Sequence, residues 1–199
     1  MQTVHHHTAK RHDIYRNTHT ALRALMADTM VRIGKLDSND EQESGAAVPG
    51  GQPAAPDPGD FLPMLASSGT AADLPDKDWQ FELKWDGVRA LVVGDASKIR
   101  LISRNGNDMS AAYPELTDRS CWPERDFVAD GEIIAVGPSG RPDFGLLQGR
   151  MKLTKAADVA KAQSSTPVRL MLFDLLSENG TDLRRLLLSE RRARLEAFH

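Results

Sequence analysis

The chain has 199 residues, of which 40% are hydrophobic and 27% charged, as expected of a soluble protein with one domain, or with one domain and a tail. No apolar run approaches the roughly 20 residues of a membrane span, and the amino terminus has no apolar signal core, which argues against membrane insertion and secretion. The net charge of −3 excludes a strongly basic nucleic-acid-binding protein, so any contact with DNA must rely on local patches.

The first 59 residues are predicted to precede the folded domain. In residues 13–34, apolar side chains recur at spacings near three and four, which predicts an amphipathic helix within an amino-terminal segment, 1–36. This helix could dock on a partner or on the domain itself. Residues 37–59 are acidic and then rich in Gly, Ala and Pro, with almost nothing to bury, which predicts a disordered linker. The folded unit is therefore expected to begin near Asp60 and to cover residues 60–199.

The centre of the chain is a predicted strand followed by a turn signal. Residues 79–84 alternate apolar with polar side chains, which predicts a strand with one buried face. The dipeptide Asp86-Gly87 indicates a turn, and the apolar run 88–93 follows it. Lys84 and Arg89 are therefore predicted to flank a tight turn between two paired strands. Two cations and a carboxylate held this closely could hold a nucleotide phosphate, although the same composition is common in plain hairpins.

The remaining elements predict an α+β fold with mixed, largely antiparallel sheets and flanking helices. Further strands are predicted over 98–103, 127–136 and 168–176, and helices over 113–118, 143–151, 156–162 and 183–198. Because the turn signal 104–106 directly follows strand 98–103, the first strands are expected to form an antiparallel meander. The last helix is predicted to face the core with Leu186, Leu187, Leu195 and Phe198.

Two carboxylates stand out in the predicted strand 127–136. Asp130 and Glu132 are two residues apart, so they lie on the same face of the strand. Apolar residues flank the pair on both sides, and buried carboxylates are costly unless a cation meets them. Lysine, arginine or Mg²⁺ would serve, which favours a functional site. The alternative is a strand end at which both acids are in water.

Two other features concern partners and compartment. The single cysteine, Cys121, excludes an internal disulfide and is typical of a reducing cytoplasm; with no activating partner nearby, we interpret it as incidental. The best local candidate for a basic patch comprises Arg184, Arg185, Arg191, Arg192 and Arg194. Glu190 and Glu196 dilute its positive charge, so a solvated helix face is the favoured interpretation.

Four short motifs are more specific together than singly. They are Lys84-Trp85-Asp86-Gly87-Val88-Arg89, Ser103-Arg104-Asn105-Gly106, Asp130-Gly131-Glu132-Ile133 and Phe173-Asp174-Leu175-Leu176. In that order they resemble the adenylation domain of ATP-dependent DNA ligases, within the covalent nucleotidyltransferase superfamily. Residues 144–150 and 188–192 also resemble the corresponding stretches of bacterial ligases of the end-joining type. The resemblance covers roughly residues 60–198.

The resemblance implies a role for each motif. Lys84 would attack the α-phosphate of ATP and carry AMP, with Mg²⁺ or Mn²⁺ offsetting the phosphate charge. Glu132 would contact the ribose or the metal, and Phe173 would stack on adenine. Arg104 would lie near the ribose or the nick phosphate and so bind DNA. The further nucleotide contacts implied by the resemblance are those of Asp86, Arg89 and the main chain of Glu82.

The resemblance also implies partners, and it leaves alternatives open. Nicked or broken double-stranded DNA is the implied substrate, with other end-joining proteins as further partners, in the bacterial cytoplasm near the nucleoid. The family continues with a glutamate-glycine motif, a paired-lysine motif and an OB-fold domain, so these residues are expected to be an amino-terminal portion. RNA ligases and capping enzymes share the lysine motif, but the stretches around Arg104, Gln148 and Arg191 argue against them. A non-catalytic fragment, or an interaction module acting through residues 13–34, is the alternative of another class.

Overall fold

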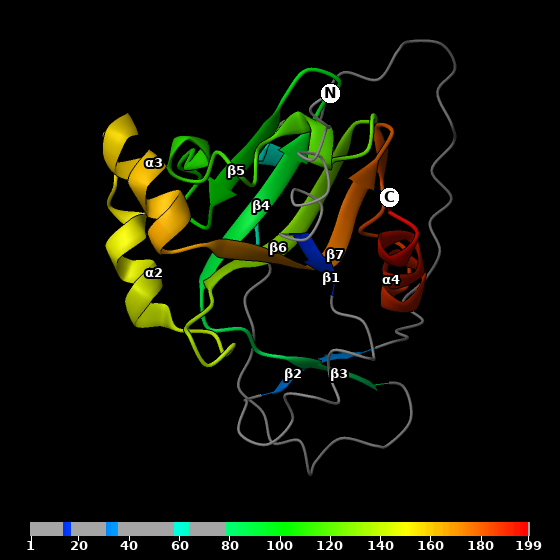
Figure 1. Cartoon of the computed structure of the whole chain (residues 1–199). Coiled ribbons are helices and arrows are strands. Elements are labelled where there is room, and N and C mark those ends of the chain that lie inside the picture. The colour runs from blue at the N-terminus through cyan, green and yellow to red at the C-terminus, as the bar shows by residue number, and fades with distance from the viewer. Residues whose placement is uncertain (1–13, 17–30, 36–57, 64–78, 199) are drawn as a thin grey trace, which may run out of the picture.

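The structure of the chain, a computed structural model, describes residues 14–16, 31–35, 58–63 and 79–198. The described strands form a six-stranded sheet in the order β1-β7-β6-β4-β5, with β8 beside β7, and a separate sheet of β2 and β3 (Figure 1). Their bounds are β1 Ile14–Arg16, β2 Val31–Lys35, β3 Trp79–Leu83, β4 Val88–Gly94, β5 Ile99–Ser103, β6 Phe127–Ala135, β7 Val168–Glu178 and β8 Thr181–Asp182.

Every described strand pair is antiparallel except β1 with β7, so the prediction of mixed, largely antiparallel sheets with flanking helices is confirmed. The helices are α2 (Phe144–Met151), α3 (Ala156–Ser165) and α4 (Leu188–Glu196). Helices α2 and α3 lie together at one end of the larger sheet, and α4 lies beside β7 (Figure 1). Short 3-10 turns occur at Pro58–Asp60, Ser110–Ala112 and Arg119–Cys121. None of the helices in the described part of the chain has the length and apolarity needed to cross a membrane.

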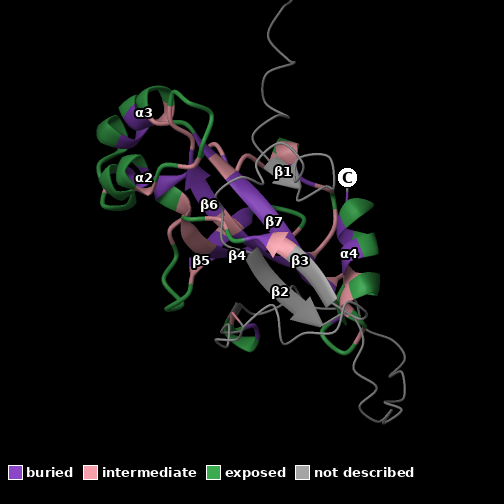
Figure 2. Ribbon diagram, turned by 90° about the horizontal axis from the view of Figure 1, so that it is seen from below, coloured by how far each residue is buried: buried purple, intermediate pink, exposed green. Residues whose placement is uncertain are grey.

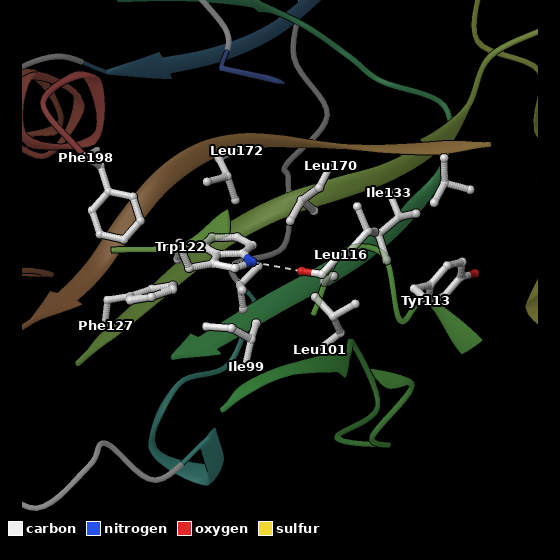
Figure 3. Packing of buried hydrophobic residues seen from close by; sticks show 14 of the residues in the cluster. Ile99, Leu101, Tyr113, Leu116, Trp122, Phe127, Ile133, Leu170, Leu172 and Phe198 are labelled. Atoms are coloured by element: carbon white, nitrogen blue, oxygen red, sulfur yellow. Dashed lines mark hydrogen bonds between the residues drawn. The ribbon is translucent and has the colours of Figure 1, made fainter. Parts of the chain in front are cut away.

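One face of the larger sheet carries the main hydrophobic core. Alternate side chains of its strands pack there with residues of the β5–β6 connection and with the end of the chain (Figure 3). The Trp122 ring stacks on Phe127 at 5.2 Å between ring centroids, and Phe198 meets Phe127 edge-on at 4.7 Å. The indole N–H of Trp122 donates to the carbonyl of Leu116 at 2.8 Å, which satisfies the polar group of a buried ring. Strands β6 and β7 are buried, whereas the helices keep an exposed side (Figure 2).

The opposite face of the sheet is partly apolar and partly charged. A smaller cluster on this face comprises Phe61, Leu91, Val93, Ile102, Val128 and Leu176. The segment that contains Phe61 is held by Arg184, which donates to the carbonyl of Asp60 at 2.9 Å and lies 4.5 Å above the Phe61 ring. Further along the same face, the strands present charged side chains in place of apolar ones, and these form the candidate site described below.

The predicted helix over residues 13–34 is wrong in the parts that the structure describes. Residues 14–16 form a strand parallel to β7, and residues 31–35 form a strand antiparallel to β3. Pairing with strands distant in the sequence outweighs the weak helical spacing of this segment. Residues 17–30 of that prediction, and residues 37–57 of the predicted linker, lie outside the described residues.

The predicted hairpin across Asp86-Gly87 is also wrong. Strand β3 pairs with β2, whereas β4 pairs with β5 and β6, so Lys84 and Arg89 connect two different sheets. The β4–β5 pair and the turn at residues 104–106, where Gly106 has φ of 80°, are as predicted. Gly87 forms a bend in the loop between the two sheets and not the tight turn of a hairpin.

Of the four predicted helices, two are confirmed, one is absent and one begins later than predicted. Helices α2 and α3 lie where they were expected, and the side chain of Asp143 caps α2 by accepting from the N–H of Leu146 at 3.1 Å. Residues 113–118 form turns and not a helix, with an i to i+3 bond from the Leu116 N–H to the Tyr113 carbonyl. Helix α4 begins at Leu188, five residues later than predicted, and Leu187 is 38% exposed where an inward position was expected.

Candidate active site

The loop between the two sheets carries the predicted nucleophile. Lys84 directly follows the buried Leu83 at the end of β3, and its side chain is exposed. Gly87 brings the loop against β6, because a Cβ atom at this position would lie 2.1 Å from the carbonyl oxygen of Ile133. The Gly87 N–H also donates to Glu132. Only glycine permits this approach, which places Lys84 near the carboxylate face of β6.

Arg89 is the cation that meets the two carboxylates. Its Nε donates to Oδ1 of Asp130 at 2.7 Å and its Nη2 to Oδ2 at 2.5 Å, a bidentate pair with geometric specificity. The side chain of Asp130 is 5% exposed and that of Arg89 is 19% exposed. The prediction that a cation meets these carboxylates is therefore confirmed for Asp130, and arginine is the residue that does so.

Glu132 lies opposite Arg89 in the β4–β6 register, on the same face of β6 as Asp130. Burial raises the pKa of Glu132 to about 7, although Arg89, the Gly87 N–H and Lys84 act in the opposite direction. Near neutral pH this carboxyl can therefore be found with or without its proton. A perturbed acid next to an exposed lysine is typical of functional sites.

Phe173 reaches the same face of the sheet through an irregularity in β7. Asp130 pairs with Asp174 and Gly131 with Leu172, so Phe173 is the extra residue of a β-bulge. Its side chain is buried, and the Arg89 guanidinium lies 5.0 Å from the centroid of its ring. The bulge thus brings an aromatic ring to the charged group, an arrangement that no sequence pattern indicated.

Helix α4 supports this part of the site with two arginines. Arg192 donates to the carbonyl of Phe173 at 2.8 Å and lies 3.5 Å from a carboxylate oxygen of Glu82. Arg191 holds the carboxylate of Asp174 through two hydrogen bonds, at 2.9 and 3.0 Å. Sequence reasoning missed these roles, because only the β7 contacts of α4 distinguish a buried arginine from a surface one.

The arginines predicted to form a basic patch or a solvated helix face, residues 184–194, are mostly engaged within the fold. Arg192 is buried and Arg191 is largely buried, so neither belongs to a solvated face or to an open DNA-binding patch. Arg184 is exposed but pairs with Asp182 at 2.7 Å, and Arg194 lies 3.5 Å from Glu178. Arg185 is exposed. Most of these cations are therefore engaged with carboxylates or carbonyls of the fold.

The structure places the remaining predicted residues at the edge of the site. Ser103 pairs with Ala90, so Arg104 leaves β5 at the end of the sheet where β4 begins, and its side chain is exposed. Asp86 is exposed in the loop after Lys84. The core of the site therefore contains Lys84, Arg89, Glu132 and Phe173, whereas Arg104 and Asp86 line its rim.

A nucleotide fits the chemistry of this group. Lysine and arginine complement phosphate, a partly exposed carboxyl can contact ribose hydroxyls or a cation, and an aromatic ring can stack on a base. No group of three or more His, Cys, Asp or Glu side chains is arranged to hold a metal in the described ranges. A divalent ion at Glu132 would accordingly take most of its ligands from phosphates and water, as Mg²⁺ commonly does.

Comparison with known proteins identifies the family. The sequence model of the ATP dependent DNA ligase domain matches residues 63–199. The chain belongs to this family. The multifunctional non-homologous end joining protein LigD of Mycolicibacterium smegmatis is 37% identical over 142 residues, which cover 71% of this chain and 17% of that protein. DNA ligase B of Mycobacterium tuberculosis is 36% identical over 142 residues, covering 68% of this chain and 28% of that one.

Solved structures agree with this assignment to the DNA ligase domain family. The fold is similar to mycobacterial DNA ligase D complexed with ATP and MES, with a TM-score of 0.60, 35% identity, and coverage of 71% of this chain and 43% of that one. The ligase domain of Mycobacterium tuberculosis LigD gives a TM-score of 0.57 at 36% identity, covering 69% of this chain and 42% of that one. Of the two curated relatives, the chain spans 17% of the M. smegmatis LigD protein and 28% of DNA ligase B.

Proposed function

We propose that this chain carries the nucleotide-binding part of an ATP-dependent DNA ligase, with Lys84 as the residue that accepts AMP. The observation that carries the proposal is the convergence of Lys84, Arg89, Glu132 and Phe173 on one face of the sheet. The family assignment and the ATP complex of the similar ligase D structure support the same nucleotide.

In the proposed reaction, the unprotonated Nζ of Lys84 attacks the α-phosphorus of ATP. A phosphorus–nitrogen bond forms, the bond to the bridging oxygen breaks, and pyrophosphate leaves with that oxygen. Arg89 and Phe173 would orient the ribose and the base. The main chain of Glu82 would meet the amino group of adenine, and Asp86 would be a further contact. Mg²⁺ or Mn²⁺, held in part by Glu132, would supply charge compensation for the phosphates.

The later steps of the proposed function concern DNA. AMP would pass from Lys84 to a 5′-phosphate, and a 3′-hydroxyl would then displace it and seal the strand. Arg104, exposed at the rim, is the residue that we propose to contact the nick phosphate. Because one relative is named for non-homologous end joining, we propose broken or nicked double-stranded DNA and other end-joining proteins as partners, in DNA repair and recombination near the bacterial nucleoid.

Self-adenylation tests the proposal directly. We expect the chain, mixed with α-phosphate-labelled ATP and Mg²⁺, to retain label on a denaturing gel, and Lys84→Ala to retain none, because the phosphoramidate forms on that nitrogen. Lys161→Ala, a substitution at an exposed position of α3, is the matched control and should label like the parent.

The other outcomes are informative as well. Label that survives in Lys84→Ala would contradict Lys84 as the acceptor. A folded parent that takes up no label would contradict independent activity of this chain and favour an interaction module. Labelling from GTP in preference to ATP would favour a capping-type enzyme, and sealing of nicked RNA in preference to nicked DNA would favour an RNA ligase.

A further inference from the structure

Arg192 contacts both sheets of the structure with one nitrogen atom. Its Nη1 donates to the carbonyl of Phe173 at 2.8 Å and lies 3.5 Å from Oε1 of Glu82. Phe173 belongs to β7 of the six-stranded sheet, whereas Glu82 belongs to β3 of the two-stranded sheet. The Arg192 side chain is 8% exposed, so this bridge is shielded from water. Shielding strengthens both contacts.

The β7 bulge depends on such a donor. A bulge takes one residue out of the regular hydrogen-bonded ladder, and the buried carbonyl of that residue still needs a partner. For Phe173 this partner is Arg192. The same bulge directs the Phe173 ring toward Arg89, so α4 influences where the ring lies.

Glu82 is held from the same side. Its side chain is 12% exposed and lies beside Arg192, so its carboxylate is engaged within the fold, and the contact that the proposed function assigns to Glu82 is that of its main chain. The guanidinium of Arg192 therefore fixes the separation between the Phe173 ring and the Glu82 main chain. In the proposed function these are the two groups that meet adenine.

We propose that Arg192 is a positioning residue for the adenine base. This inference rests on the proposed function and names the part of the nucleotide that Arg192 serves. Lysine at this position keeps one positive charge, but its flexible stem lacks the rigid guanidinium plane that holds Nη1 between the Phe173 carbonyl and the Glu82 carboxylate. Loss of Arg192 should therefore weaken recognition of the base and leave recognition of the triphosphate near Lys84 in place.

Arg194 provides a matched control on the same helix. Its side chain is 50% exposed and lies 3.5 Å from a carboxylate oxygen of Glu178, at the end of β7. Replacing Arg194 thus perturbs the same helix without touching the bridge between Phe173 and Glu82. A general loosening of α4 would affect both variants alike.

The test compares the affinities for ATP·Mg²⁺ and GTP·Mg²⁺ by calorimetry in a Lys84→Ala parent, in which the covalent step is blocked. Adding Arg192→Lys should weaken ATP binding roughly tenfold and leave GTP binding within about twofold, so the preference for adenine shrinks. Adding Arg194→Lys should leave the ratio of the two affinities unchanged. Thermal melts establish that each variant is folded. Should Arg192→Lys not fold, Glu82→Ala, which removes the carboxylate at the other end of the bridge and keeps the main chain, should lower the same ratio.

Other results would overturn the inference. An unchanged ratio in folded Arg192→Lys and Glu82→Ala contradicts it, and so does a parent that shows no preference between ATP and GTP. The two proposals fail differently. A chain that binds ATP in this manner but never labels Lys84 contradicts the ligase chemistry alone, whereas unchanged base selectivity in a chain that does label contradicts only the positioning role of Arg192.

Discussion

At the scale of single residues, the acidic pair in β6 shows what a sequence can reveal. Two carboxylates on one face of an apolar strand require a cation, and this requirement follows from desolvation alone. That Arg89 is the cation depends on the β4–β6 register, which no local pattern specifies. The Phe173 bulge was likewise beyond prediction, because it arises from a register shift between two strands about forty residues apart.

Glu132 should make the stability of the protein depend on pH. Its ordinary pKa of 4.5 is raised to about 7 in the folded state, so the folded protein binds more protons than the unfolded chain between these values. The contribution of Glu132 to stability is therefore most favourable below pH 4.5 and is lost as the pH rises through 7. We expect the urea midpoint of Glu132→Gln to fall less than that of the parent between pH 5 and pH 8.

Glu124→Gln, at an exposed position, provides the control for removing one carboxylate. It should leave the pH dependence of the urea midpoint as it is in the parent. If Glu132→Gln and the parent lose stability in parallel across this range, Glu132 does not titrate near neutrality in the folded protein, and its proposed contact with a ribose or a metal would then involve a fully ionised carboxylate.

At the scale of elements, strands and helices were mostly predictable, but strand partners were not. Asp86-Gly87 does mark a change of direction, yet β3 pairs with β2, which lies more than forty residues earlier. Residues 31–35 alternate Val31 and Ile33 with polar neighbours or glycine, so a strand signal was present within the longer helical pattern. A five-residue alternation is too short to outweigh a twenty-residue periodicity when the pairing partner is unknown.

Helix α2 illustrates how one buried side chain can hold an element in place. The Arg150 side chain is fully buried; it donates to the carbonyls of Thr166 at 2.8 Å and Ala112 at 3.2 Å, and it contacts Glu115. Its guanidinium also lies 5.3 Å from the centroid of the Tyr113 ring. Arg150 thus joins α2 to the β5–β6 connection and to the end of α3.

Replacing Arg150 should be strongly destabilising. Arg150→Met keeps the aliphatic volume but leaves Glu115 without its cation, and the carbonyls of Ala112 and Thr166 without this donor, so we expect a loss of about 3–5 kcal/mol in the free energy of unfolding. Urea unfolding followed by circular dichroism measures this loss. Arg141→Met, at an exposed arginine just before α2, should change the free energy of unfolding by less than about 0.5 kcal/mol. Equal effects of the two substitutions would show that the Arg150 contacts contribute nothing beyond its hydrophobic stem.

At the scale of the whole molecule, the candidate site is assembled from parts far apart in the sequence. Lys84 follows β3 of one sheet, Arg89 and Glu132 lie on β4 and β6 of the other, and α4 supports both sheets through Arg192. The sequence motifs could name these candidate residues because each motif is local. The relative placement of the two sheets could not be predicted, because it depends on the loop at Gly87 and on contacts such as the Arg192 bridge, which join residues far apart in the sequence.

This assembly predicts that ATP·Mg²⁺ stabilises the entire described fold and not one loop. A ligand that binds only the folded state stabilises it by about 2.7 kcal/mol at one hundred times its dissociation constant, which for a chain of this size raises the melting temperature by roughly 5–10 °C. We expect a single cooperative melt that moves upward as a whole, because the ligand is proposed to contact both sheets at once. GTP·Mg²⁺ at the same concentration should produce a smaller shift, since its base lacks the amino group that the Glu82 main chain is proposed to meet.

A broad melt that responds to neither nucleotide would show that the two sheets do not form a common pocket, and the interaction-module alternative would then be favoured. A melt that moves equally with both nucleotides would locate the binding energy in the phosphates near Lys84 and would count against base recognition by Phe173.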